Sequence, residues 1–138
     1  MKYKNFIKYW LPVILYIILI FYLSSVQFPI LTISSKTGIK LNEITPYIYH
    51  VSEFGLLSYL LWRALKNSNF KNPQLCTVIF CIIYAVSDEI HQLYVPSRVF
   101  SFLDISSDIS GILVVQLGIY YINLYKSNLK EIKKKSKF

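Results

Sequence analysis

Charged residues are scarce in this sequence of 138 residues, and acidic side chains are fewer than basic ones. Charged side chains make up 16% of the chain, against about 25% in an ordinary soluble domain. Hydrophobic residues make up 54% and aromatic residues 17%. A water-soluble fold of this size would have to expose much of that apolar surface. A lipid bilayer solvates such surface, so the composition indicates one small membrane domain.

The sequence also lacks the motifs of several common chemistries. Only four glycines are present, and there is no phosphate-cradling glycine loop, no nucleophile elbow and no HExxH pattern. Cys76 and Cys81 lie five residues apart in one apolar run, where a helix holds them too far apart for a disulfide. We therefore expect no metal site and infer no particular cofactor. One minority alternative is a metal held across helices, with candidate ligands His50, Glu53, Asp88, Glu89 and His91.

The net charge of +8 does not indicate a nucleic-acid partner, because the basic residues form no folded face. They are crowded instead against the ends of apolar segments. Lys2, Lys4 and Lys8 precede the first one, and six lysines follow the last: Lys126, Lys130, Lys133, Lys134, Lys135 and Lys137. Basic groups in these places set membrane orientation and contact anionic lipid head groups.

Four apolar segments predict an all-α membrane protein, a bundle of four transmembrane helices with a lipid bilayer as its surroundings. The predicted spans are residues 9–28, 46–65, 74–95 and 102–125, followed by a basic tail, 126–138, that frays or lies on the membrane surface. Residues 29–45 read as a polar connection. The second span is the weakest, since His50 and Glu53 interrupt it. The first segment has the basic start of a signal peptide but no small-residue cleavage site after it, which favours a retained anchor.

The distribution of lysine and arginine predicts the orientation of these spans. With four spans, twelve of these residues lie on the side of both termini, and three lie on the other side: Lys36, Lys40 and Arg98. The positive-inside rule then places both termini in the cytoplasm of a multi-pass cell-membrane protein.

Five of the seven acidic residues lie within or at the ends of the last three spans, namely Glu53, Asp88, Glu89, Asp104 and Asp108. The predicted orientation puts all five toward the outer face, together with His50, His91, Gln92 and Arg98. Ionisable groups at membrane depth are costly unless they face protein or water, which makes them candidates for function. We therefore predict a polar site at the outer end of the bundle.

Helical geometry places these side chains on definite faces. On the third span, Asp88, Glu89, His91 and Gln92 fall within an arc of about 160°. The opposite side carries Ile79, Ile83, Val86, Ile90 and Leu93. On the second span, His50, Glu53 and Leu57 share a face.

On the fourth span a stripe is formed by Asp104, Asp108, Gly111, Val115 and Gly118, in which Gly111 and Gly118 would let a neighbouring helix approach closely. Ser101 is predicted to cap this helix, with Asp104 answering in its first turn.

Each candidate also has a structural interpretation. Asp104 would complement the helix dipole at the start of the fourth helix. Arg98 would pair with a carboxylate and fix the loop 95–102. Gln92 is more typical of a hydrogen bond between helices than of a catalyst.

The segment SDEIHQLYVPSRVFSFLDISSDISG, residues 87–111, resembles the signature of the VanZ-like family. The positions that match are Asp88, Glu89, Gln92, Pro96, Arg98, Asp104, Asp108 and Gly111. Ser97 stands where glycine is common, and Asp108 stands where asparagine is frequent. The upstream YHVSEFGLLSYLL resembles the family's His-x-x-Glu segment, giving His50 and Glu53, and the first span also fits. The family is named for a protein that confers low-level resistance to teicoplanin, a glycopeptide antibiotic that acts on cell-wall precursors.

Two functions fit these residues. The first, which we favour, is a non-enzymatic protein whose acidic, histidine and arginine site binds or protects a cell-envelope component, with resistance to a glycopeptide drug as one form of it. The second is a membrane-embedded enzyme acting on a lipid-linked or cell-wall precursor. Its candidate catalytic residues are Asp88 or Glu89 as general base and His50 as proton shuttle, with Arg98 as an electrostatic clamp. A third interpretation is that the network only locks helix packing. The sequence predicts neither the ligand nor the oligomeric state.

Overall fold

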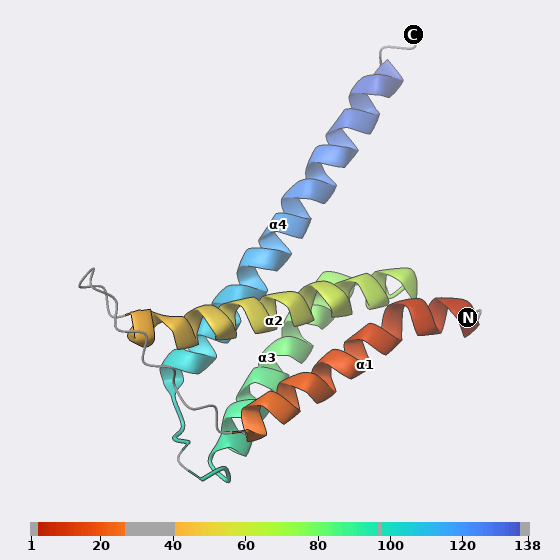
Figure 1. Cartoon of the computed structure of the whole chain (residues 1–138). Helices are drawn as coiled ribbons and strands as arrows, with labels where there is room; N and C mark the ends of the chain where they lie inside the picture. Colours follow the sequence, from red (N-terminus) through yellow and green to blue (C-terminus); the bar gives the residue numbers. More distant parts are fainter. Residues whose placement is uncertain (1–2, 27–40, 97, 136–138) are drawn as a thin grey trace.

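The computed structural model describes residues 3–26, 41–96 and 98–135, and within these ranges the chain forms four α helices and no strand. Figure 1 shows them in chain order: α1 (Tyr3–Ser25), α2 (Leu41–Asn67), α3 (Pro73–Gln92) and α4 (Phe102–Lys135). The predicted all-α class with four helices is confirmed.

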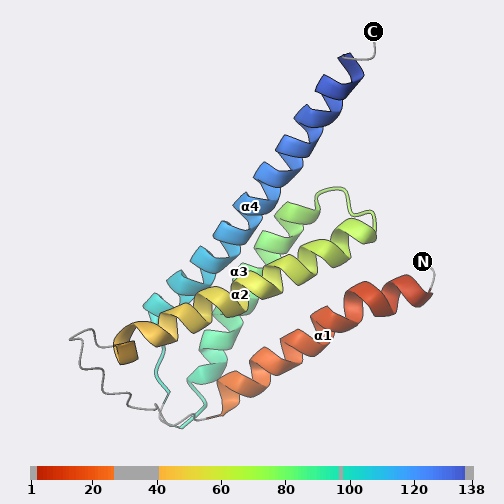
Figure 2. The same ribbon diagram turned by 45° about the horizontal axis from the view of Figure 1, so that its top comes forward.

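Helix α2 is the centre of the bundle, because each of the other three helices packs against it. Figures 1 and 2 show α3 crossing behind it, and Figure 2 shows α1 and α4 on its opposite sides. Half of the buried core comes from α2, and the other helices supply the rest: Phe54, Leu57, Leu61, Ala64 and Leu65 from α2, Val13 and Ile20 from α1, Cys81 and Ala85 from α3, and Ile112 from α4. The two cysteines therefore act as the packing residues expected of them, with Cys81 buried and Cys76 half-buried.

Three helices are long and apolar enough to cross a membrane by length and composition: α1 from Asn5 to Ser25, α3 and α4. Helix α2 is not among them, since His50, Glu53 and Arg63 lower its hydropathy. The polar groups of such a helix can face protein instead of lipid, as His50 does against Asp108 of α4.

The two faces of α3 are divided as predicted. The side chains of Ile79, Ile83, Val86, Ile90 and Leu93 are exposed, whereas Asp88, Glu89 and Gln92 are buried. In a membrane the exposed apolar face would lie against lipid, and the polar face is turned into the bundle.

Several helix ends differ from the predicted segments. Residues 41–45, predicted to belong to a connection, are the first turn of α2, and Pro46 lies inside the helix. A proline so near a helix end removes only one backbone bond, which does not end the helix. Helix α3 ends at Gln92 and not at Val95, because Leu93, Tyr94 and Val95 donate to carbonyls three residues back in a tightened turn.

The basic tail is helical as far as Lys135, so residues 126–135 are not frayed, which was one of the two arrangements predicted for the tail. Helix α4 continues through Lys135, and no glycine or proline follows Gly118 to interrupt it. Glu131 and Lys135, one turn apart, form an exposed ion pair of 3.1 Å. With 34 residues, α4 is about 51 Å long at 1.5 Å per residue, and its C-terminal half extends beyond the other helices (Figure 1).

Candidate functional site

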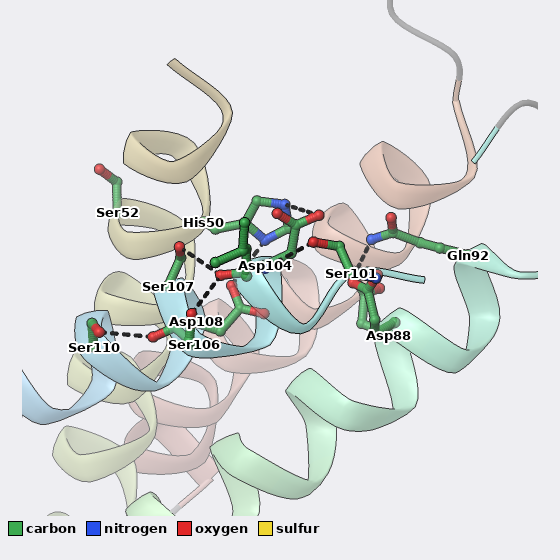
Figure 3. A network of polar contacts seen from close by, with 12 residues as sticks. His50, Ser52, Asp88, Gln92, Ser101, Asp104, Ser106, Ser107, Asp108 and Ser110 are labelled. Carbon is green, nitrogen blue, oxygen red and sulfur yellow. Dashed lines mark hydrogen bonds and ion pairs between the residues drawn. The ribbon is translucent and has the colours of Figure 1, made fainter. Parts of the chain in front are cut away.

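His50 of α2 lies against two aspartates of α4 (Figure 3). Its Nδ1 is 2.9 Å from Asp108 Oδ1, and its Nε2 is 3.8 Å from Asp104 Oδ2. The side chain of Asp108 is 2% exposed, against 12% for His50 and 19% for Asp104. Asp108 is therefore buried inside the bundle, whereas Asp104 is partly exposed at its end.

Two glycines allow α2 and α4 to lie close enough for this contact. A Cβ added to Gly111 would overlap the backbone carbonyl oxygen of Val51, one residue after His50. Gly55 lies one turn further along α2, and a Cβ added to it would be 3.3 Å from the Val115 side chain of α4. The prediction for Gly111 is confirmed, and Gly55 is a partner that the sequence reasoning missed.

The same prediction is wrong for Gly118. Nothing lies within 4 Å of a Cβ added there, and the residue is exposed. At this level the buried face of α4 has shifted to Gln116 and Ile119, with Gln74 of α3 bonded to the Gln116 carbonyl. A stripe of residues predicted from regular helical spacing assumes the same neighbouring helix throughout, and here α4 also contacts α3.

The carboxylates of α3 are both held by hydrogen bonds. Gln92 Nε2 donates to Asp88 Oδ2 at 3.0 Å, one helical turn away. Glu89 is 1% exposed and accepts a bond of 2.6 Å from the backbone N–H of Ser101, across the connection between α3 and α4. Glu89 thus fixes the point where α4 begins.

Ser101 caps α4 as predicted, since its Oγ accepts a bond of 3.2 Å from the Asp104 N–H. The reciprocal bond differs from the prediction. In a capping box the acid in the first turn would take the Ser101 N–H, but here Glu89 of α3 takes it. Because Glu89 accepts the Ser101 N–H, the carboxylate of Asp104 is not used in the cap. It faces His50 instead and belongs to the cluster (Figure 3).

Glu53 and Arg98 are oppositely charged and half-buried beside this network. None of the ion pairs between described residues includes Glu53 or Arg98, however. The direct carboxylate pair predicted for Arg98 is therefore not formed with any residue that the structure describes, and Ser97 of the same motif lies outside the described residues.

His91 lies apart from the cluster, on the side of α3 that faces α1. Its Nε2 is 2.9 Å from Ser25 Oγ, and its ring packs against the ring of Phe21, with the two ring centroids 4.4 Å apart. His91 therefore joins α1 to α3. Within the described ranges, no three His, Cys, Asp or Glu side chains are arranged to hold a metal ion.

A second layer of buried polar groups lies deeper in the bundle, and the sequence reasoning missed it. Gln116 Nε2 donates to the Ser58 carbonyl at 3.1 Å, and Gln74 Nε2 donates to the Gln116 carbonyl at 3.2 Å. Ser58 and Thr77 are fully buried. The signal available in the sequence was Gln116 itself, a polar amide in the middle of the uncharged segment 109–125.

These features define a class: an all-helical membrane protein whose buried carboxylates and histidine are gathered from α2, α3 and α4 at one end of the bundle. The profile of the VanZ/LLP1 family matches residues 9–125, which is most of the chain. The chain belongs to this family, and the resemblance seen in its sequence is confirmed. Searches of curated proteins and of solved structures gave no match.

Proposed function

We propose that the chain is a multi-pass protein of the cell membrane, in which all four helices cross, both termini are cytoplasmic and the polar cluster faces outward. Contacts between α1 and α2 support the arrangement. Trp10 donates to Ser68 Oγ at 2.9 Å, and Arg63 donates to the Lys8 carbonyl at 2.9 Å. The start of α1 and the basic connection between α2 and α3 therefore share one end of the bundle, opposite to the cluster.

Cysteine labelling tests this orientation. Cys76 and Cys81 are replaced by alanine, and a single cysteine is placed at Val99, which is 76% exposed, or at Lys133. In intact cells a membrane-impermeant maleimide should label Val99→Cys, and it should label Lys133→Cys only after permeabilisation. The reverse pattern would contradict the orientation.

The cluster itself binds a component of the cell envelope in this proposal. One observation carries it: Glu53 and Arg98 lie half-buried with opposite charges and form no ion pair with each other or with another described residue. A guanidinium in this setting is suited to a carboxylate or phosphate of a ligand. Glu53 and Asp104 are suited to its hydroxyl or amino groups. Cell-wall precursors and glycopeptide drugs both carry such groups.

A binding experiment with purified protein in mild detergent tests this function. The probes are teicoplanin and a lipid-linked cell-wall precursor, and the variants are Arg98→Gln and Glu53→Gln. Each variant should weaken binding of the recognised probe about tenfold or more, because it removes a charge-assisted hydrogen bond. Lys133→Gln and Glu131→Gln are the matched controls, since both residues are exposed near the end of α4.

A parallel susceptibility assay tests the resistance form of the proposal. Cells expressing the protein should tolerate more teicoplanin than cells expressing Arg98→Gln at equal protein level. Equal tolerance would remove glycopeptide resistance from the proposal. If Arg98→Gln and Glu53→Gln both bound the two probes as well as the unmodified protein, the network would serve only to hold the helices together.

The enzymatic alternative is favoured by a different observation, the His50–Asp108 pair at 2.9 Å. A carboxylate on Nδ1 orients an imidazole and stabilises its protonated form, which is how histidine serves as a general base. Asp88 and Glu89 are already occupied by Gln92 and Ser101, so in this alternative His50 is the base. An enzyme would turn over the lipid-linked precursor, and His50→Gln would bind it without product formation. Absence of product with the unmodified protein would leave binding as the function.

A further inference from the structure

A cavity of about 400 Å³ lies at the opposite end of the bundle from the polar cluster. It is formed where the end of α2, the beginning of α3 and the middle of α4 meet. Its polar and aromatic lining is Trp62 and Lys66 of α2, Lys71, Asn72 and Gln74 around the start of α3, and Asn123 of α4. No residue of the cluster lines it, so this cavity is a separate feature of the molecule.

The charged residues that line this cavity are both lysines. Lys66 and Lys71 contribute two ammonium groups, and no carboxylate is found among the residues that line the cavity. Lys66 Nζ lies 4.6 Å from the centre of the Trp62 ring, and such a contact holds a long, flexible side chain in place. An uncompensated pair of ammonium groups in a concave site attracts an anion.

The carboxamides of the lining can add neutral donors to these charges. Asn72 stands at the N-cap position of α3, yet its side chain makes no cap hydrogen bond. Its amide group is therefore not committed to the helix. Gln74 is partly committed, because its Nε2 donates to the Gln116 carbonyl. The first turn of α3 adds the positive end of a helix dipole to the same side of the cavity.

The position of the cavity indicates what kind of anion reaches it. The apolar span of α3 begins at Pro73, so the cavity lies where a membrane helix enters the interface. Trp62 is an aromatic residue typical of that level. We propose that this cavity binds the phosphate group of an anionic phospholipid at the membrane surface. The inference does not depend on the function proposed for the cluster.

Vesicles of stated composition test the site. The protein is reconstituted in phosphatidylcholine with increasing phosphatidylglycerol, and the emission of Trp62 is followed. The chain has two tryptophans, so Trp10→Phe makes Trp62 the only reporter. Lys66→Gln with Lys71→Gln should raise the half-saturating fraction of phosphatidylglycerol about tenfold, since each lysine contributes separately to attraction. Lys130→Gln with Lys133→Gln, which removes two exposed lysines of the tail outside the cavity, should raise that fraction much less, because these lysines add only general attraction to anionic lipid.

Native mass spectrometry gives a second measurement that needs no tryptophan substitution. The unmodified protein should retain phosphatidylglycerol in mild detergent, and the Lys66/Lys71 variant should lose it. Equal loss in the Lys130/Lys133 control would mean general charge attraction and would overturn the site. Inorganic phosphate is titrated in the absence of lipid as a third arm. A response of Trp62 to phosphate but not to phosphatidylglycerol would overturn a lipid as the source of the anion.

Discussion

His50 is the residue on which the polar cluster depends, because its two ring nitrogens lie 2.9 Å from Asp108 and 3.8 Å from Asp104. A buried carboxylate is stable only when it is paired or hydrogen-bonded. Asp108, whose side chain is 2% exposed, depends on such a partner more than Asp104, whose side chain is 19% exposed. The histidine therefore supports the fold at Asp108 while its other nitrogen faces the open side.

The His50–Asp108 pair gives a stability prediction. His50→Leu should lower the free energy of unfolding by about 3 kcal/mol, because it leaves a buried carboxylate without its partner. The combined variant His50→Leu with Asp108→Leu should recover most of that loss, since it removes both polar groups together. Denaturant titration in detergent micelles measures both.

The control for this experiment is the exposed pair of Glu131 and Lys135, whose side chains are 66% and 77% exposed. Glu131→Gln should change the free energy of unfolding by less than about 0.5 kcal/mol. If the double variant at His50 and Asp108 were less stable than either single variant, the pair would have to be favourable in itself, contrary to this account.

At the scale of the helices, the contact between α2 and α4 is set by Gly111. Gly111→Ala should lower the free energy of unfolding by about 1–3 kcal/mol, because the added methyl group overlaps the Val51 carbonyl and forces the helices apart. Gly118→Ala on the same helix meets open space and should raise it by up to about 1 kcal/mol through helix propensity. The same micelle titration measures both, and equal effects would show that backbone flexibility, and not contact, decides the result.

The beginning of α4 yields another prediction. Ser101→Ala removes the hydroxyl that accepts the Asp104 N–H and should lower the free energy of unfolding by about 1 kcal/mol. Ser106→Ala is the matched control, because that hydroxyl bonds only the Leu103 carbonyl within the helix. Amide hydrogen exchange at residues 102–105 should quicken in the first variant alone. Unchanged exchange there would mean that Glu89, through the Ser101 N–H, is sufficient to hold the helix start.

Local patterns were enough to predict the helices and much of the cluster. The alternation of exposed isoleucines with buried Asp88 and Glu89 on α3, and the cap at Ser101, follow from spacing along one helix. The bond from Ser101 to Glu89 and the approach of Gly55 to α4 join residues from different helices. Such contacts depend on crossing angles, which one helix does not encode by itself. For the same reason the stripe on α4 failed at Gly118, where the neighbour changes.

At the scale of the whole molecule, the arrangement separates two polar ends. The acidic and histidine cluster lies at one end of the bundle, and Lys8, Arg63, Lys66 and Lys71 lie at the other. Between them α2 contacts all three other helices and turns His50 toward α4, while Ile48, Tyr49 and Leu56 form an exposed apolar face. Composition alone, applied to the whole segment, does not separate these two faces, and this is why α2 was the weakest of the predicted spans.

The overhanging end of α4 makes this division testable. All residues from Lys126 to Lys135 are exposed, so a chain ending at Tyr125 should keep its free energy of unfolding within about 0.5 kcal/mol. The truncation nevertheless removes six of the twelve basic residues assigned to the cytoplasmic side. We therefore expect more molecules in the inverted orientation, detected as reduced labelling of Val99→Cys in intact cells. Replacing the tail lysines by glutamine in the full-length chain should reproduce that loss of labelling while keeping the helix. If only the truncation reduced labelling, the length of α4 and not its charge would determine orientation, and the tail would act as a cytoplasmic anchor.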